Sequence, residues 1–261
     1  MGFLTIGTVL IIAGLLFGGA GELSKEVTEL VHVIRTGVSE SVERIPLLES
    51  ITNINGFTLV VDKDEVSVKV NEEYETIRGD YKDEQLADAS TVQNMNISIL
   101  NGNCYIYPSE NGYYGVESRG AEDYQCYVEN GTLYLNAFPK DLGGEEAVSE
   151  IILYVPVEKE HDKVILFCSA DKVTLDVPLK GKELNISSLC GENQLLQEVD
   201  FDETSVTVGV GNFTTNGLCA DDFNIEVSTA DAEIKGMNVR TMSVSLGMGT
   251  LRIQGHTDGD I

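Results

Sequence analysis

The sequence contains no tryptophan, only five prolines and only three histidines in 261 residues. The histidines, His32, His161 and His256, lie far apart, and none has a metal-ligand spacing such as HxxxH or CxxH. We therefore interpret them as surface or loop residues. The sequence also lacks a GxSxG elbow, a P-loop and a GxGxxG motif before a helix. We predict no catalytic residues, no cofactor-binding residues, no metal ligands and no cofactor.

Basic residues are scarce, since 17 Lys and Arg stand against 43 Asp and Glu, which gives a net charge of −26. A surface of this sign repels phosphate backbones, so nucleic acid is not a predicted partner. It attracts divalent cations and basic partners. The simplest interpretation of the charge is that it keeps an exposed protein soluble.

The cysteines show no disulfide or metal-binding pattern. Their number is odd, no CxxC occurs, and a chain of this length needs no disulfide framework. The sequence therefore predicts buried free thiols at Cys104, Cys126, Cys168, Cys190 and Cys219.

Residues 1–21, MGFLTIGTVLIIAGLLFGGAG, carry no charged side chain. About twenty such residues span a bilayer core as a helix, so this segment predicts a transmembrane helix. A cleaved signal peptide is the alternative, because Gly18 and Ala20 are small, and a buried soluble helix is a third interpretation. Gly14 and Gly18 form a GxxxG pattern, which can let two such helices approach closely.

Residues 22–50 predict a short amphipathic helix or linker. Between residues 27 and 45, small and apolar residues are spaced 4-3-4-3-4 with charges between them, and Pro46 ends the pattern. This segment could form an oligomerising stalk, or lie on the membrane or on the domain that follows. Lys25 and Arg35 give a weak positive-inside signal for a cytoplasmic bulk, which does not settle the orientation.

From residue 54 onward, alternation of apolar and polar residues predicts strands, and we assign residues 51–160 to an N-terminal β region. The expected strands are 57–61, 65–70, 96–100, 104–107, 125–130, 132–136 and 151–155. Asn-Gly pairs at 101–102, 111–112 and 130–131 predict tight turns between them. The polar and acidic segment 77–91 is interpreted as a loop.

Residues 161–261 contain a repeat. VTVGVGNFTTNG, IEVSTADAEIKG and VSLGMGTLRIQG begin at the evenly spaced residues Val206, Ile225 and Val244, and this period of 19 holds over residues 206–255. A fixed period near twenty with glycine in each copy predicts a β-solenoid, in which stacked coils bury a continuous core. The small residue in the middle of each copy, Gly211, Ala230 or Gly249, needs a close backbone approach or a positive φ.

An earlier copy, ISILNGNCYIYP, places Cys104 at a core position. The last copy reaches its final core position at Ile261 without a polar cap. We therefore expect that the chain is truncated at its C-terminus, or that the open edge pairs with another copy or a partner.

Acidic residues matter because parallel β-helices can carry polysaccharide-cleaving sites on one face. Outward columns traced through the repeat, such as Thr207/Glu226/Ser245, hold one acid at most. Glu233 beside Arg252 predicts an exposed ion pair. A cluster of three acids beside a cleft would favour a carbohydrate-active enzyme instead.

The segments IILYVPVEKE and VILFCSADKVTLD, followed by the glycine-containing copies, resemble the bacterial putative-adhesin family. The resemblance covers residues 54–261. It implies a repetitive β-solenoid domain of unknown function in an envelope-associated protein, and it brings no catalytic residues.

The sequence thus predicts an all-β fold class: a β-solenoid or β-helix-like repeat domain after an N-terminal transmembrane helix and a short amphipathic helix. The expected function is a non-catalytic, membrane-anchored, extracytoplasmic structural or adhesin-like binding module. The expected localisation is a single-pass position in a bacterial cell membrane. Alternatives are a cytoplasm-facing membrane scaffold or stress sensor, and a carbohydrate-active β-helix enzyme. Expected partners are the membrane, a protein or surface glycan, or a second copy bound through the open edge or residues 27–45.

Overall fold

The computed structural model describes residues 53–54, 57–61, 66–70, 72–100, 102–138 and 150–257. These residues form two β-sheets, with a single three-residue 3₁₀ helix, η2 (Ala89–Thr91), among them. The smaller sheet is antiparallel, in the order β1 (Asn53–Ile54), β2 (Phe57–Val61), β3 (Val66–Val70).

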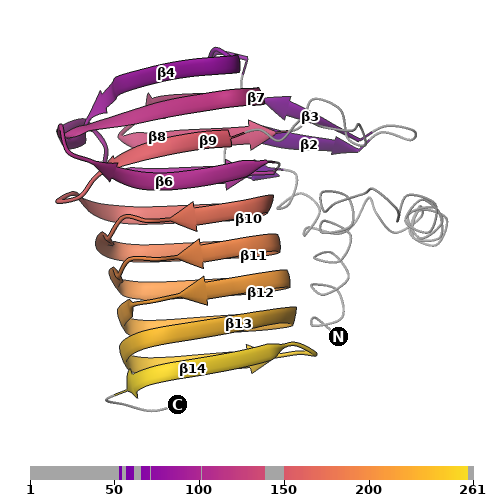
Figure 1. Cartoon of the computed structure of the whole chain (residues 1–261), viewed down its shortest axis with the longest axis vertical. Helices are drawn as coiled ribbons and strands as arrows, with labels where there is room; N and C mark the ends of the chain where they lie inside the picture. The colour runs from indigo at the N-terminus through magenta and orange to yellow at the C-terminus, as the bar shows by residue number, and fades with distance from the viewer. Residues whose placement is uncertain are drawn as a thin grey trace.

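The larger sheet contains eleven strands and holds the core (Figure 1). Its strands are β4 (Ile77–Asp88), β5 (Asn94–Ile99), β6 (Asn103–Ser109), β7 (Tyr113–Glu129), β8 (Thr132–Phe138), β9 (Glu150–Pro156), β10 (Glu160–Leu175), β11 (Leu179–Leu195), β12 (Val199–Thr215), β13 (Leu218–Leu246) and β14 (Thr250–Thr257).

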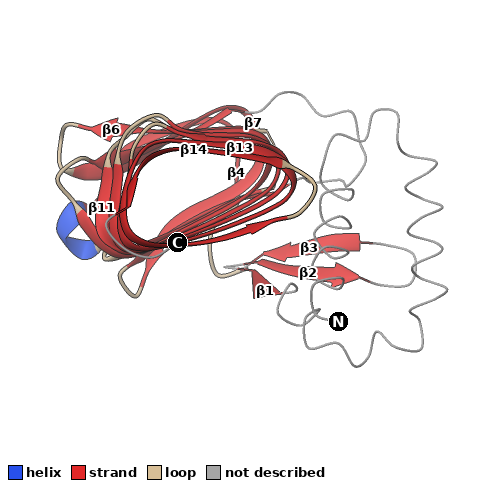
Figure 2. Ribbon diagram, turned by 90° about the horizontal axis from the view of Figure 1, so that it is seen from below, coloured by secondary structure: helices blue, strands red, loops and turns tan. Residues whose placement is uncertain are grey.

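Strands β10 to β14 pair in parallel, one on the next, and we call them the parallel stack. Leu166 pairs with Ile186, and Ile186 pairs with Val206, which is one position more than the period of the repeat in each case. From Val206 onward the pairing follows the period of the repeat, since Val206 pairs with Ile225. Each strand curves around a common interior, as the view along the stack shows (Figure 2). The regular offset therefore places like positions of successive strands above one another.

Alternation along each curved strand directs every second side chain inward. Val206, Ile225 and Phe213 are at most 1% exposed, and so is Cys104, as the sequence predicted. All five cysteines are free, as predicted, but only Cys104 and Cys168 are buried, while the other three are half-buried. Burial raises the pKa of the Cys104 thiol to about 12, so this residue packs as a small apolar side chain.

The predicted fold class is wrong beyond its all-β character. The parallel stack does not continue unchanged through residues 94–156. There the pairings β10–β5–β8–β7–β9–β6–β10 close the sheet into a ring, and β7 pairs antiparallel with β4, β8 and β9. The described domain is therefore one mixed sheet that closes on itself, rather than a β-solenoid. The repeat in the sequence did not reveal this ring, because even its parallel pairs, such as Ile97 with Leu135 and Cys104 with Ile151, are not separated by the period.

No described helix is long and apolar enough to cross a bilayer. The predicted transmembrane helix of residues 1–21 and the amphipathic helix of residues 22–50 lie outside the described residues. The single-pass membrane localisation therefore has no support in the structure, and we withdraw it. The division of the β domain at residue 160 stays a prediction.

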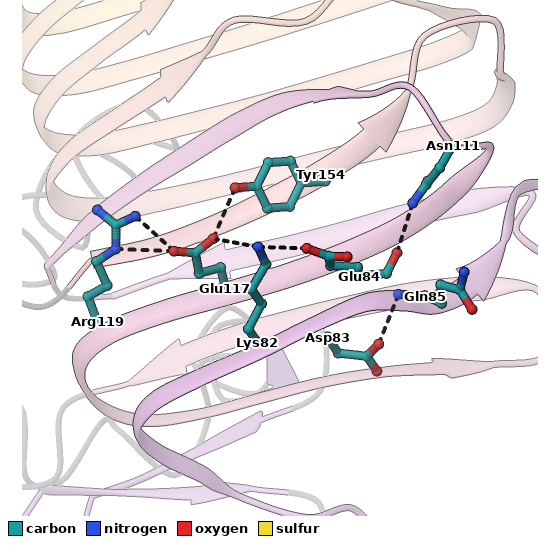
Figure 3. A network of polar contacts seen from close by, with 8 residues as sticks. All are labelled: Lys82, Asp83, Glu84, Gln85, Asn111, Glu117, Arg119 and Tyr154. Atoms are coloured by element: carbon teal, nitrogen blue, oxygen red, sulfur yellow. Dashed lines mark hydrogen bonds and ion pairs between the residues drawn. The ribbon is translucent and has the colours of Figure 1, made fainter.

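Segment 77–91 is not a loop, because most of it is strand β4. Among the described strands it pairs only with β7, through Ile77 with Tyr124 and Asp88 with Tyr113 among others. An edge strand has solvent along one side and can keep polar side chains, so it does not show the apolar alternation of a buried strand. Lys82 of β4 contacts Glu117 of β7, with its ammonium 3.8 Å from the carboxylate (Figure 3). Glu117 also accepts hydrogen bonds from Arg119 of β7 at 2.8 Å and from the Tyr154 hydroxyl of β9 at 3.1 Å.

His161 is not a surface residue, since it is only 2% exposed. Its Nε2 lies 2.8 Å from the hydroxyl of Tyr114, which is also buried. Burial lowers the pKa of His161 to about 4, with a smaller contribution in the same direction from the Lys159 ammonium. His256 is exposed, as predicted, and His32 lies outside the described residues.

The small residues of the repeat occupy one close-packed column of the stack. Gly211 has a φ of 110° and pairs with Ala230. A Cβ at Gly211 would collide with the carbonyl oxygen of Gly191, and one at Gly249 would collide with that of Ala230. Both reasons expected for small residues here, positive φ and close backbone approach, are present.

We expect Gly211→Ala to lower the free energy of unfolding by about 2–3 kcal/mol, because it adds a backbone collision to an unfavourable φ. Gly112→Ala is the control, since Gly112 has a φ of 77° but open space around its Cβ position. It should cost only about 1 kcal/mol. Urea unfolding compares the two variants, and equal losses would contradict the packing explanation.

The buried His161 predicts a pH dependence of stability. Its folded pKa lies below the unfolded value of 6.5, so the unfolded chain binds more protons between pH 4 and pH 6.5. Stability should be full above pH 6.5 and fall by up to about 3 kcal/mol as the pH drops through this window. His161→Phe should remove this part of the pH dependence in urea-unfolding measurements. An unchanged slope in the variant would assign the pH dependence to other groups.

Candidate functional site

A groove on the outer face of the parallel stack is the candidate site. It has a volume of about 480 Å³ and crosses β11, β12 and two segments of the long strand β13, residues 222–224 and 241–243. Two outward columns line it: Glu183, Glu203, Asp222 and Thr241 form the first, and Asn185, Ser205, Asn224 and Ser243 form the second. Thr204, Phe223 and Met242, which lie between the two columns in the sequence, line it as well.

The pairing register creates these columns. Glu183 pairs with Glu203, and Glu203 pairs with Asp222. Residues two positions apart on a strand point to the same side, so Ser205 lies beside Glu203 on the same face. Neighbouring strands are about 4.8 Å apart, so the three acids form a row of like charges roughly 10 Å long.

A basic residue compensates the first acid of the row. The Lys163 ammonium lies 2.7 Å from Glu183 Oε1, and the Asn185 amide donates a hydrogen bond of 2.6 Å to the same oxygen. Lys163, followed by Asn185, holds the pKa of Glu183 below its usual range. Glu183 is therefore ionised at neutral pH.

The last acid of the row is also compensated. Arg240 lies 3.4 Å from Asp222 and 3.6 Å from Asp221, and the Thr241 hydroxyl donates a hydrogen bond to Asp222. These contacts come from the next coil, so they depend on the same register as the acids.

Glu203 stands between the two compensated acids. Among the described residues it has no ion pair and no side-chain hydrogen bond, and it is exposed. Like charges opposite one another in neighbouring strands are destabilising, so the centre of the row carries an unbalanced negative charge. A cationic group placed in this groove could form an ion pair with Glu203.

The carboxylate of Glu117 differs from that of Glu203, because it is paired with basic residues. Arg119 and Lys82 contact this carboxylate, and Lys82 also pairs with Glu84 at 2.7 Å (Figure 3). Arg119 also reaches Glu150 at 4.0 Å. Arg119, as the largest influence, keeps the pKa of Glu117 low. These charges are satisfied within the protein, so the network stabilises β4 on β7 and offers no unpaired group.

Sequence analysis missed the row of acids. The columns it traced were confined to the constant period of the repeat, and there each holds one acid, as expected. Glu203 and Asp222 keep this period, but they precede the copies that were traced, the first of which begins at Val206. Glu183 and Glu203 are separated by one position more than the period because the turn from β11 to β12 is longer. The pairing of Glu233 with Arg252 in register is as predicted, but the Glu233 carboxylate forms its ion pair with Lys235, at 2.9 Å.

A second hollow of about 410 Å³ lies at the start of β4. Tyr74 stacks on Tyr127 at 3.6 Å beside it, and Arg78 at its rim is paired with Asp123 at 2.7 Å. Arg78 is therefore already engaged, and Glu75 is the other charged residue that lines this hollow. Among the described residues, no group of three His, Cys, Asp or Glu could hold a metal ion.

No family model matches the chain, and no curated protein matches it significantly. Solved structures do. A putative adhesin from Parabacteroides distasonis is 16% identical over 72% of this chain and 81% of that one, with a TM-score of 0.49. A putative adhesin from Parabacteroides merdae is 14% identical over 71% and 98%, with a TM-score of 0.38. A putative cell adhesion protein from Clostridium sporogenes is 11% identical over 68% and 100%, also with a TM-score of 0.38.

Two of these three structures carry the family name that the sequence resemblance indicated, putative adhesin. At these identities and TM-scores, the likeness carries no argument about what this chain binds.

The unbalanced row predicts that neutralising its centre stabilises the fold. Glu203→Gln should raise the free energy of unfolding by about 0.5 kcal/mol at low ionic strength, because it removes two like-charge contacts. High salt should abolish the gain. Glu226→Gln is the control, since its register partner in β12 is Thr207. A loss of stability in Glu203→Gln would show that Glu203 has a stabilising partner.

Proposed function

We propose that the chain is a non-catalytic binding module of the adhesin type, and that its groove binds a basic segment of a partner protein. The observation that supports this proposal is the unpaired carboxylate of Glu203 at the centre of the groove. The proposal rests on the groove and not on the names of the structural neighbours.

The electrostatics favour a cationic ligand. The net charge of −26 attracts basic partners to the protein, and the row of acids would provide the place at which they bind. A lysine or arginine side chain beside Glu203 would relieve the repulsion from Glu183 and Asp222. The relief of this repulsion would contribute to the binding free energy.

The second column suits a peptide backbone. Asn185, Ser205, Asn224 and Ser243 offer amide and hydroxyl groups, which donate to carbonyl oxygens and accept from N–H groups. In an extended peptide, side chains on one face are about 6.7 Å apart. Two alternate basic residues would therefore reach along most of the acid row, while the backbone lies against the neutral column.

The three acids beside a cleft also favour the carbohydrate-active enzyme as a second candidate. A glycoside hydrolase needs one carboxyl group whose pKa is raised, so that it can act as the general acid. Glu183 has its pKa lowered by Lys163, which opposes that role. The arrangement therefore suits binding better than hydrolysis.

The probe for the proposed function is a fluorescently labelled peptide of alternating arginine and glycine. We expect wild-type protein to bind it in fluorescence anisotropy, and Glu203→Gln to weaken binding about fivefold, which corresponds to roughly 1 kcal/mol. Glu226→Gln removes the same charge from another column and should leave binding unchanged.

Equal weakening by both variants would contradict the proposal, because it would show only general attraction to an acidic surface. Release of reducing ends from soluble polysaccharides by wild-type protein, lost in Glu203→Gln, would favour the enzyme instead.

A further inference from the structure

The hollow at the start of β4 lies on strands that take no part in the groove around Glu203. Residues 74–78 and Tyr81 line it together with Cys126 and Tyr127 of β7. β4 lies at the opposite end of the larger sheet from β14 (Figure 1). The volume of the hollow, about 410 Å³, falls within the range of about 300–1,000 Å³ that is usual for small-ligand sites.

The ring of Tyr74 is held in one position by its neighbours. It stacks on the ring of Tyr127, with the centroids 3.6 Å apart and the planes at 6°, and Tyr127 in turn stacks on Tyr134 at 5.0 Å. A hydrogen bond with Glu129 raises the pKa of the Tyr74 hydroxyl. The backbone carbonyl of Tyr74 accepts a hydrogen bond of 2.9 Å from the Gln125 amide. One face of this half-buried ring is therefore covered, and the opposite face is left for a ligand in the hollow.

Tyr81 supplies a second aromatic ring. It is 40% exposed, and it is the only one of the ten tyrosines that is exposed rather than buried or half-buried. Its hydroxyl group forms no hydrogen bond with a described residue, and the same is true of the side chains of Glu75 and Thr76. The hollow thus combines aromatic surface with hydroxyl and carboxylate groups that can bond to a ligand.

The charges of the hollow favour a neutral ligand. Arg78 is the one basic residue that lines it, and Asp123 neutralises this guanidinium through two hydrogen bonds, from Nε and from Nη2. An anionic ligand would therefore meet no unpaired positive charge. The Nη1 group of Arg78 takes no part in the pair and can still donate to a neutral oxygen.

We propose that this hollow binds a neutral saccharide. A β-linked glucose ring has apolar C–H groups on its two faces and hydroxyl groups around its edge. One face would lie against the open face of Tyr74, with Tyr81 beside it, while the hydroxyl groups would bond to Arg78 Nη1, Thr76 and Glu75. A wholly apolar ligand would leave these polar groups without partners.

A quaternary ammonium ligand is the competing occupant, because tyrosine rings beside a carboxylate can also hold a cation. Such a ligand has no hydrogen-bonding groups, so it would leave the Arg78 and Thr76 donors unused. It would also bring a positive charge next to the Arg78 guanidinium. A saccharide uses both the rings and the donors, and for this reason it is the ligand class that fits the hollow better.

Saturation-transfer-difference NMR of the full chain with cellohexaose tests the proposal. Cellohexaose is a neutral β-1,4-linked glucose oligosaccharide. Wild-type protein should transfer saturation to the sugar, and more strongly to the ring hydrogens on one face of each glucose than to those on the other. Because the sugar carries no charge, higher salt should leave its binding unchanged.

Substitutions of Tyr74 separate ring stacking from other effects. Tyr74→Ala should weaken cellohexaose binding about fivefold, because it removes a ring face. Tyr74→Phe keeps the ring and should bind like wild type. Tyr107→Ala is the matched control, since Tyr107 is a half-buried tyrosine of β6 that does not line the hollow. Thermal unfolding verifies that each variant is folded, and Tyr81→Ala replaces Tyr74→Ala if that variant is not.

This inference does not rest on the proposed function of the groove, and the two can fail separately. Glu203→Gln should bind cellohexaose like wild type, and Tyr74→Ala should bind the arginine–glycine peptide like wild type.

Three results would overturn the proposal. The first is the absence of saturation transfer from wild-type protein to cellohexaose at about 5 mM sugar. The second is equal weakening by Tyr74→Ala and Tyr107→Ala, which would place the sugar elsewhere. The third is binding of choline in place of cellohexaose, lost in Tyr74→Ala, which would assign the hollow to a quaternary ammonium ligand.

Discussion

The parallel backbone ladder of β10 to β14 is the interaction on which the rest of the structure depends. Its register repeats at a nearly constant interval, so Leu166, Ile186, Val206 and Ile225 stack on one another inside the domain. None of these strands could bury its apolar side chains alone, since each relies on the strands on either side to cover them. The close approach at Gly191 and Gly211 is a condition of this register, because a Cβ at Gly211 would force the neighbouring coils apart.

The same register acts on the outer face, where it has a cost. It stacks like positions whether or not their side chains attract each other, so Glu183, Glu203 and Asp222 come to lie in one row. Lys163 and Arg240 compensate the two ends of this row from the coils beyond it. Repetition stabilises the interior but accumulates like charges on the exterior, which leaves the carboxylate of Glu203 unpaired at the centre of the groove.

The sequence predicted those features of the fold that follow from a local pattern of residues or from a fixed spacing between them. Strand alternation, the core position of Cys104 and the small residues at 211, 230 and 249 depend on local pattern and a fixed offset. The ring through β5, β8, β7, β9 and β6 was not predictable, because β7 pairs antiparallel with β8 and β9 and the parallel pairs of the ring, such as Ile97 with Leu135, lie at separations other than the period of the repeat. β4 was missed because a polar edge strand resembles a loop. The buried His161 was missed because its partner Tyr114 is 47 residues away.

The candidate groove shows how sensitive such prediction is to one residue. Glu183 and Glu203 are separated by one position more than Glu203 and Asp222, since the turn between β11 and β12 is longer than the one that follows β12. A turn of different length changes the spacing in the sequence without changing which side chains stack, because the ladder restores the register on the following strand. A site built by stacking is therefore defined by which strands are hydrogen bonded to each other, rather than by a constant spacing in the sequence. The three acids are not evenly spaced in the chain, but their charges interact because the fold places them on neighbouring strands.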